Sequence, residues 1–177
     1  MEAKDARTPG FGKVLYDFIL PLYKAAPPQR KRLVKAACLL HDVSWRAHPD
    51  YRAEVCFDNA TRANLGGLKH SERIYLGLAL LHRYSNKREN TRFEDLYQMV
   101  DEKTRNEAEI LGKAMRFGAM MWMCGWFFRL ASDQDVAVGH LLRRLVDAPV
   151  VDIVQQLCKC RPHLSGKVAQ CRADLAS

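Results

Sequence analysis

Apolar residues recur every three or four positions in segment after segment of this chain, and prolines and glycines separate the segments. This spacing places apolar side chains on one face of a helix, whereas a half-buried strand needs strict alternation. The chain has 177 residues and is 48% hydrophobic, which is enough for one domain with a sizeable core. The pattern therefore predicts a mainly α-helical protein that folds by burial alone.

Prolines, glycines and polar stretches set the limits of the expected helices. Pro21 is expected to kink the first helix or to end it early, because proline has no amide donor. Pro28 suits the first position of a helix, and Ser71 is expected to cap the helix that follows it. The longest helix is expected to be central and closely packed through small residues such as Gly118. The expected helices span residues 12–25, 28–43, 49–64, 71–84, 93–100 and 104–123.

The pattern changes in the last third of the chain. Residues 141–146 and 150–154 are apolar or β-branched runs separated by Asp147-Ala148-Pro149, which is typical of a β-hairpin, although the first run also fits a helix. A closing helix is expected over 165–176. We therefore expect a disordered lead-in (1–10), a helical domain (11–130) and a small hairpin-plus-helix appendage packed on it (131–177).

Charge and cysteine content narrow the class of protein. Lys and Arg number 28 against 20 Asp and Glu, and the formal charge of +8 favours polyanionic partners. The six cysteines form no regular disulfide framework and no secretory signal precedes them, so we expect reduced thiols and a cytoplasmic protein. Cys158 and Cys160 are too closely spaced for a typical zinc pair, and their role stays open. No apolar run approaches the roughly 18 residues of a membrane span.

A His-Asp pair, His41 and Asp42, closes the second expected helix. Both are ligand types that divalent cations accept, so a metal site is one interpretation. In the other, His41 lies at the helix C-terminus, where the dipole favours an imidazolium, and Asp42 pairs with a nearby arginine such as Arg46.

Several further cations and imidazoles fall at helix ends or in first turns, where side chains and free amides can converge on an oxyanion. These candidate phosphate-binding residues are Arg46, His48, Arg52, His70, Arg73, His82 and Arg83. The basic run Arg30-Lys31-Arg32 with Lys35 is expected to be a solvated helix face, because no nucleic-acid recognition motif accompanies it.

Four stretches occur in a distinctive order: Leu39-Leu40-His41-Asp42, residues 45–53, residues 69–73, and Leu81-His82-Arg83-Tyr84. This order resembles the C-terminal helical region of the exopolyphosphatase/guanosine pentaphosphate phosphatase family. The run from Trp45 to Arg52 is the most specific part, and residues 166–176 are similar to the closing helix of that region. The resemblance runs from about residue 11 to the C-terminus and implies an HD-like helical bundle.

In that family, catalysis belongs to two N-terminal actin-like lobes, which hold the phosphate, a divalent metal and the catalytic carboxylate. No such lobe is visible in this sequence. The resemblance therefore implies a helper domain, separated from its catalytic half, that guides polyphosphate or a phosphorylated guanosine nucleotide and contributes to a homodimer. On its own it is expected to hydrolyse nothing and to need no cofactor, with Mg²⁺ or Mn²⁺ expected for the full-length enzyme.

Two alternatives stay open. The first is an autonomous HD-type phosphohydrolase, in which His41 and Asp42 bind a metal that acidifies a water. That chemistry needs a further histidine, yet none precedes His41, so His70 or His82 would have to serve, with Asp95 or Asp101 as the last ligand. The second alternative is a basic module that binds a protein or a nucleic acid.

Overall fold

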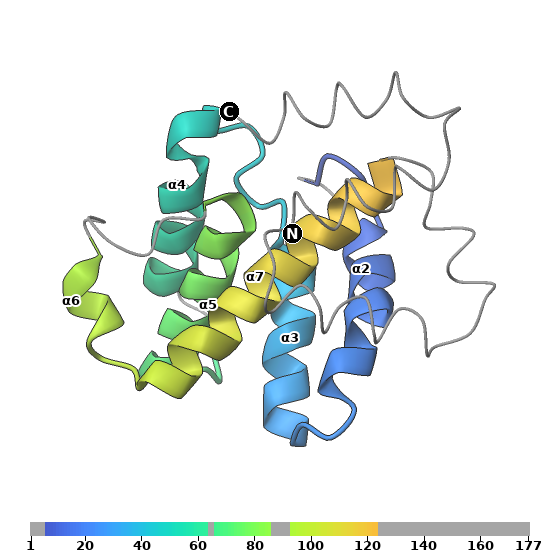
Figure 1. Cartoon of the computed structure of the whole chain (residues 1–177). Coiled ribbons are helices and arrows are strands. Elements are labelled where there is room, and N and C mark those ends of the chain that lie inside the picture. The colour runs from blue at the N-terminus through green and yellow to red at the C-terminus, as the bar shows by residue number, and fades with distance from the viewer. Residues whose placement is uncertain (1–5, 64–65, 86–92, 124–177) are drawn as a thin grey trace, which may run out of the picture.

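The computed structural model describes residues 6–63, 66–85 and 93–123 (Figure 1). All regular structure within these ranges is helical, and they contain no strand. The elements in chain order are α2 (Phe11–Ile19), η1 (Leu20–Tyr23), α3 (Pro28–Leu40), α4 (Pro49–Arg62), α5 (His70–Tyr84), α6 (Glu94–Tyr97) and α7 (Glu102–Met123). The prediction of a mainly α-helical protein is confirmed for this part of the chain.

Prolines determine the ends of the first two helices. The α-helix α2 ends at Ile19, and Pro21 lies in the short 3₁₀ turn η1 that follows, so the expected early end is confirmed. Proline has no amide to donate and its ring clashes with the preceding turn. Pro28 occupies the first position of α3, as expected. The helix ends at Leu40 rather than at residue 43, and successive tight turns carry the chain to α4.

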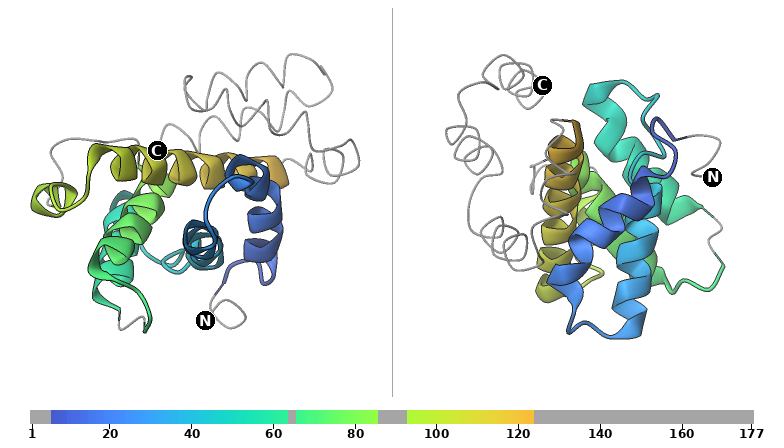
Figure 2. Two further views of the ribbon diagram at one scale, coloured as in Figure 1. Left: turned by 90° about the horizontal axis from the view of Figure 1, so that it is seen from below. Right: turned by 90° about the vertical axis from the view of Figure 1, so that its right-hand side faces the viewer.

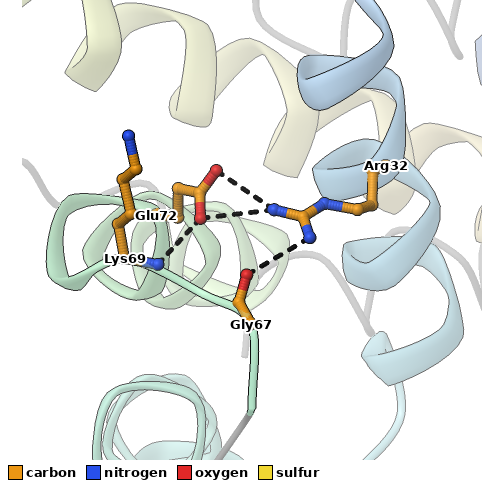
Figure 3. Close-up of polar contacts among 4 residues, drawn as sticks. All are labelled: Arg32, Gly67, Lys69 and Glu72. Carbon is orange, nitrogen blue, oxygen red and sulfur yellow. Dashed lines mark hydrogen bonds and ion pairs between the residues drawn. The ribbon is translucent and has the colours of Figure 1, made fainter.

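The N-terminus of α5 differs from the expectation. The helix begins at His70, so Lys69 takes the capping position and Ser71 lies inside the first turn. Glu72 closes this end instead, since its Oε2 accepts a hydrogen bond of 2.8 Å from the Lys69 amide (Figure 3). A glutamate three residues into a helix can reach back in this way, so the Ser71 prediction was wrong.

Helix α5 is the most enclosed element of the bundle. Its residues from Ile74 to His82 are all buried, and it packs against α4 on one side and α7 on the other. Helix α2 packs on α3 and α7, so that α7 lies across both halves of the bundle (Figure 2). The described core is therefore built around α5, and α7, which was expected to be central, packs against both α5 and α2.

Two glycines allow α7 to approach its neighbours closely. A Cβ atom at Gly112 would lie 2.6 Å from the His82 Cβ and 2.7 Å from the Ala79 carbonyl oxygen of α5. A Cβ atom at Gly118 would lie 2.5 Å from Leu15 Cδ1 of α2. Real Cβ atoms do not come so near, so close packing through small residues of this helix is confirmed.

Other expectations concern residues that lie outside the described part, namely the hairpin over 141–154, the closing helix and residues 1–5 of the lead-in. The HD-like arrangement and the three-part division of the chain stay predictions. Among the described helices, none is both long and apolar enough to cross a membrane.

Candidate functional site

Three helix ends meet near the His-Asp pair. The C-terminal ends of α3 and α5 and the N-terminal end of α4 lie toward the same end of the bundle (Figure 1). His41 is the first residue after α3 and is only 3% exposed. Its Nδ1 lies 2.8 Å from the Cys38 carbonyl oxygen, and its ring meets Phe11 edge-on at 5.2 Å between centres. Because a carbonyl can only accept, Nδ1 donates this bond and satisfies a carbonyl of the last turn of α3.

Asp42 has its oxygens turned toward two donors. Oδ2 accepts from the Arg7 amide at 3.1 Å, and Oδ1 accepts from the Tyr84 hydroxyl at 3.3 Å. The same hydroxyl donates to the His41 carbonyl oxygen at 2.8 Å. Asp42 therefore binds Tyr84 and the N-terminal segment, and the expected pairing with Arg46 was wrong.

Tyr84, at the end of α5, has two arginines over its ring. The guanidinium carbons of Arg83 and Arg52 lie 4.7 and 5.6 Å from the ring centre. Burial raises the pKa of the Tyr84 hydroxyl, while the positive charges of Arg83 and Arg52 act in the opposite direction. The hydroxyl therefore stays protonated at neutral pH and acts as a donor.

Arg52 is fixed in place by the turn between α3 and α4. Its Nε and Nη2 donate to the Ala47 carbonyl oxygen at 3.3 and 3.0 Å. Nη1 is not used in these bonds and remains a donor of this half-buried side chain. Arg52 therefore combines a structural link to the turn with a cation held beside Tyr84.

The charge of Arg83 also acts on the guanidinium of Arg116 in α7. Burial lowers the pKa of Arg116, and the charge of Arg83 lowers it further. Among the described residues, the buried Nε of Arg83 has no hydrogen-bond partner. The prediction from sequence missed Arg116, although a cation that interrupts the apolar stretch of 110–128 was a usable signal. We refer to Asp42, Arg52, Arg83, Tyr84 and Arg116 as the Tyr84 cluster.

Arg46 and His48 lie on the exposed turn that leads into α4. The Arg46 guanidinium lies 5.0 Å from the centre of the Trp45 ring. His48 caps α4, and its Nδ1 accepts from the Asp50 amide at 3.4 Å. Arg52 braces this same turn, so these two side chains are neighbours of the Tyr84 cluster along the chain.

The remaining three candidates lie elsewhere. His70 and Arg73 occupy the first turn of α5, and at 1.5 Å per residue His70 is roughly 20 Å along the helix from Arg83. His82 is 4% exposed and faces the core, with its ring 6.4 Å from that of Tyr97. The structure thus brings Arg52 and Arg83 together but does not gather all seven candidates on one surface.

The basic run of α3 is largely occupied by structural contacts. Arg32 donates to the Gly67 carbonyl oxygen at 3.2 Å and pairs with Glu72 at 3.3 Å, which ties α3 to the start of α5 (Figure 3). Arg30 pairs with Glu107 at 3.0 Å and covers the Tyr75 ring at 4.2 Å. These contacts between helices correct the expectation of a simply solvated face.

Metal binding was one interpretation of His41 and Asp42. Within the described residues, no group of three or more His, Cys, Asp or Glu side chains comes close enough to hold an ion. The His41 Nδ1 and both Asp42 oxygens are engaged in hydrogen bonds, as described above. Cys38 and Cys56 are buried free thiols of the core, where burial raises the pKa of Cys38 to about 12. His41 and Asp42 therefore supply two possible ligands without a third beside them in the described part of the chain, and metal binding by this pair stays a prediction.

The fold and the cluster define a helical protein with partly buried cations at helix ends. Comparison with protein families matches residues 24–143 to the family described as exopolyphosphatase, C-terminal. The match covers well over half of the chain, and the chain belongs to this family. The resemblance drawn from the order of the motifs is therefore confirmed. A search of curated proteins finds no match.

Proposed function

We propose that this chain binds and guides polyphosphate, or a related polyanion such as a phosphorylated guanosine nucleotide, as the C-terminal part of an exopolyphosphatase-type protein. Catalysis then belongs to actin-like lobes outside this chain. The observation that carries the proposal is the placement of Arg52 and Arg83, from two different helices, over one tyrosine ring. Guanidiniums form bidentate, charge-assisted hydrogen bonds with phosphate oxygens.

The charge of the whole chain supports the same function. A formal charge of +8 attracts a polyanion over a range that salt shortens. Arg46 is exposed on the turn beside the cluster and extends the basic surface, and the His48 imidazole is exposed on the same turn. Polyphosphate is a uniform polymer of phosphate units. Its affinity for the Tyr84 cluster and the neighbouring turn would therefore depend on charge and on the positions of the guanidiniums.

Titration of the chain with polyphosphate at low and high salt tests the proposal. We expect affinity to fall as salt rises, and Arg52→Gln and Arg83→Gln each to weaken binding roughly tenfold, the effect of losing a charge-assisted hydrogen bond. Arg62→Gln is the matched control, because this arginine is 79% exposed and pairs with Asp58 at the other end of α4. Binding that is indifferent to salt, or equal losses in all three variants, contradicts a specific site.

The alternative of an autonomous metal phosphohydrolase is tested by assaying phosphate release. We expect none from polyphosphate, guanosine pentaphosphate or simple phosphodiesters with added Mg²⁺ or Mn²⁺, because the described residues bring no group of three or more metal-binding side chains together. Metal-dependent activity that disappears in His41→Ala would establish the enzyme instead.

Dimer formation is the second part of the proposed role. The motifs resemble a region that contributes to homodimers, and the chain exposes Tyr51 and Met99 at 64% and 55%. Light scattering after size-exclusion chromatography measures the mass directly, and a mass of one chain at all concentrations would remove this part of the proposal.

A further inference from the structure

The segment just before α2, residues 6–10, ends in a tight turn, and we refer to it as the N-terminal strap. The Thr8 carbonyl oxygen accepts a hydrogen bond of 3.2 Å from the Phe11 amide, which closes a four-residue turn. Gly10 has a φ of 83° and a ψ of −13°, the conformation of the third residue of a type II turn. Proline is common at the second position of such a turn, where this chain has Pro9. These four residues therefore reverse the direction of the chain immediately before the helix.

Phe11 anchors this turn next to the His-Asp pair. Its side chain is 5% exposed, and its ring meets that of His41 edge-on. Because His41 directly precedes Asp42, a turn anchored here brings the strap close to the carboxylate. The Arg7 amide accordingly donates a hydrogen bond of 3.1 Å to Asp42 Oδ2.

Asp42 connects the strap to the two arginines over the Tyr84 ring. Its other oxygen accepts from the Tyr84 hydroxyl, and Arg52 and Arg83 lie over that ring. A carboxylate in this position repels phosphate, and the repulsion is stronger where the pair is partly withdrawn from water. A polyanion bound at the cluster therefore gains from a further cation on the side of Asp42.

The Arg7 side chain is suited to supply that cation. The residue is exposed, and its guanidinium has no hydrogen-bond or ion-pair partner among the residues that the structure describes. The side chain starts from the same residue whose amide Asp42 holds, and its apolar stem is long enough for the guanidinium to reach beyond the carboxylate. Its planar set of donors matches phosphate oxygens.

We infer that Arg7 is a further polyanion-binding residue, which the N-terminal strap brings to the Tyr84 cluster so that it contacts a phosphate unit beside those held by Arg52 and Arg83. The inference rests on the proposed function of polyphosphate binding. A polymer with a charge on every unit can contact three arginines that come from the strap, from α4 and from α5. Arg7 belongs to no helix, so its contribution depends on the turn at Gly10.

Titration of the full chain with polyphosphate tests the charge of Arg7. Arg7→Gln should weaken binding about threefold to tenfold, the effect of losing one hydrogen bond. Arg62→Gln makes the same change at a distant, 79% exposed arginine and should alter affinity less than about twofold. Equal losses in the two variants, or an unchanged affinity in Arg7→Gln, overturn the inference. The proposed function stands if Arg52→Gln still weakens binding in that assay, whereas no binding by the unaltered chain removes both.

A double variant distinguishes contact with phosphate from simple compensation of Asp42. If Arg7 contacts phosphate, Arg7→Gln should cause the same fold loss of affinity in an Asp42→Asn background as in the unaltered chain. If Arg7 only offsets the negative charge of Asp42, the loss should disappear in that background. The second result overturns the inference.

The turn provides a variant that leaves every charge in place. In Gly10→Ala the added Cβ meets nothing within 4 Å, but alanine disfavours the φ of 83°, so the strap should shift. Affinity should then fall to about the value of Arg7→Gln. Gly67→Ala is the matched control, because its φ of 76° is equally unfavourable and it precedes the far end of α5. Circular dichroism checks that the variants are folded. An unchanged affinity in Gly10→Ala, or equal losses in the two glycine variants, overturns the role of the strap.

Discussion

Tyr84 makes hydrogen bonds that hold the fold together and also contacts two cations. Its hydroxyl donates to the His41 carbonyl and to Asp42, while its ring lies beneath Arg52 and Arg83. The His-Asp pair was noticeable in the sequence, but two of its partners, Arg7 and Tyr84, lie 35 or more positions away. The same two residues that suggested a metal centre therefore serve to close a helix and to orient a tyrosine.

Tyr84→Phe should destabilise the fold by about 1 kcal/mol, the usual net value of a lost hydrogen bond between protein groups. The free energy of unfolding from urea titration measures this loss. Tyr51→Phe is the control, because Tyr51 is 64% exposed and its hydroxyl is free to bond to water. Equal effects in the two variants would show that the Tyr84 hydroxyl makes no net contribution.

The buried thiol of Cys38 makes stability depend on alkaline pH. Its pKa is raised to about 12 in the folded chain by burial, whereas the unfolded thiol ionises near its ordinary value. Unfolding then releases a proton above about pH 9, so the stability of the folded state falls as pH rises, by up to about 1.4 kcal/mol per pH unit for this group. Cys38→Ala should reduce that slope by a corresponding amount between pH 9 and 11. Parallel pH profiles for the two proteins would contradict the assignment.

At the scale of elements, α5 and α7 approach each other closely at Gly112. The periodicity of the sequence was sufficient to place the helices, because prolines and polar stretches interrupt it at nearly every end. It could not show that Glu72 rather than Ser71 closes the start of α5, since both residues suit that region of a helix. Nor could it show that Gly112 fits against His82, because that contact depends on how the two helices cross.

Gly112→Ala should destabilise the fold by roughly 1–3 kcal/mol, since the added methyl would meet a Cβ atom and a backbone oxygen that cannot move away freely. Thermal and urea denaturation measure the change. Gly66→Ala is the matched control, because a Cβ atom there meets nothing within 4 Å, and we expect less than about 0.5 kcal/mol.

At the scale of the whole molecule, an anion that binds only the folded chain must stabilise it. Short polyphosphate should raise the melting temperature, and the gain should increase with the logarithm of its concentration above the dissociation constant. Arg83→Gln should show a much smaller gain at the same concentration. A gain of equal size in the variant would indicate diffuse attraction to the net charge of +8 rather than binding at the cluster.

The sequence alone determined the helical class, most helix limits and the family, because these depend on periodicity, on proline chemistry and on the order of local motifs. It also identified Arg52 and Arg83 as cations at helix ends. Only the tertiary structure decided that these two meet at Tyr84, and that His82 is buried while His70 and Arg73 lie at the far end of α5. The reason is physical: a helical pattern fixes which face a residue occupies, but the crossing of helices fixes which charges share a low-dielectric site.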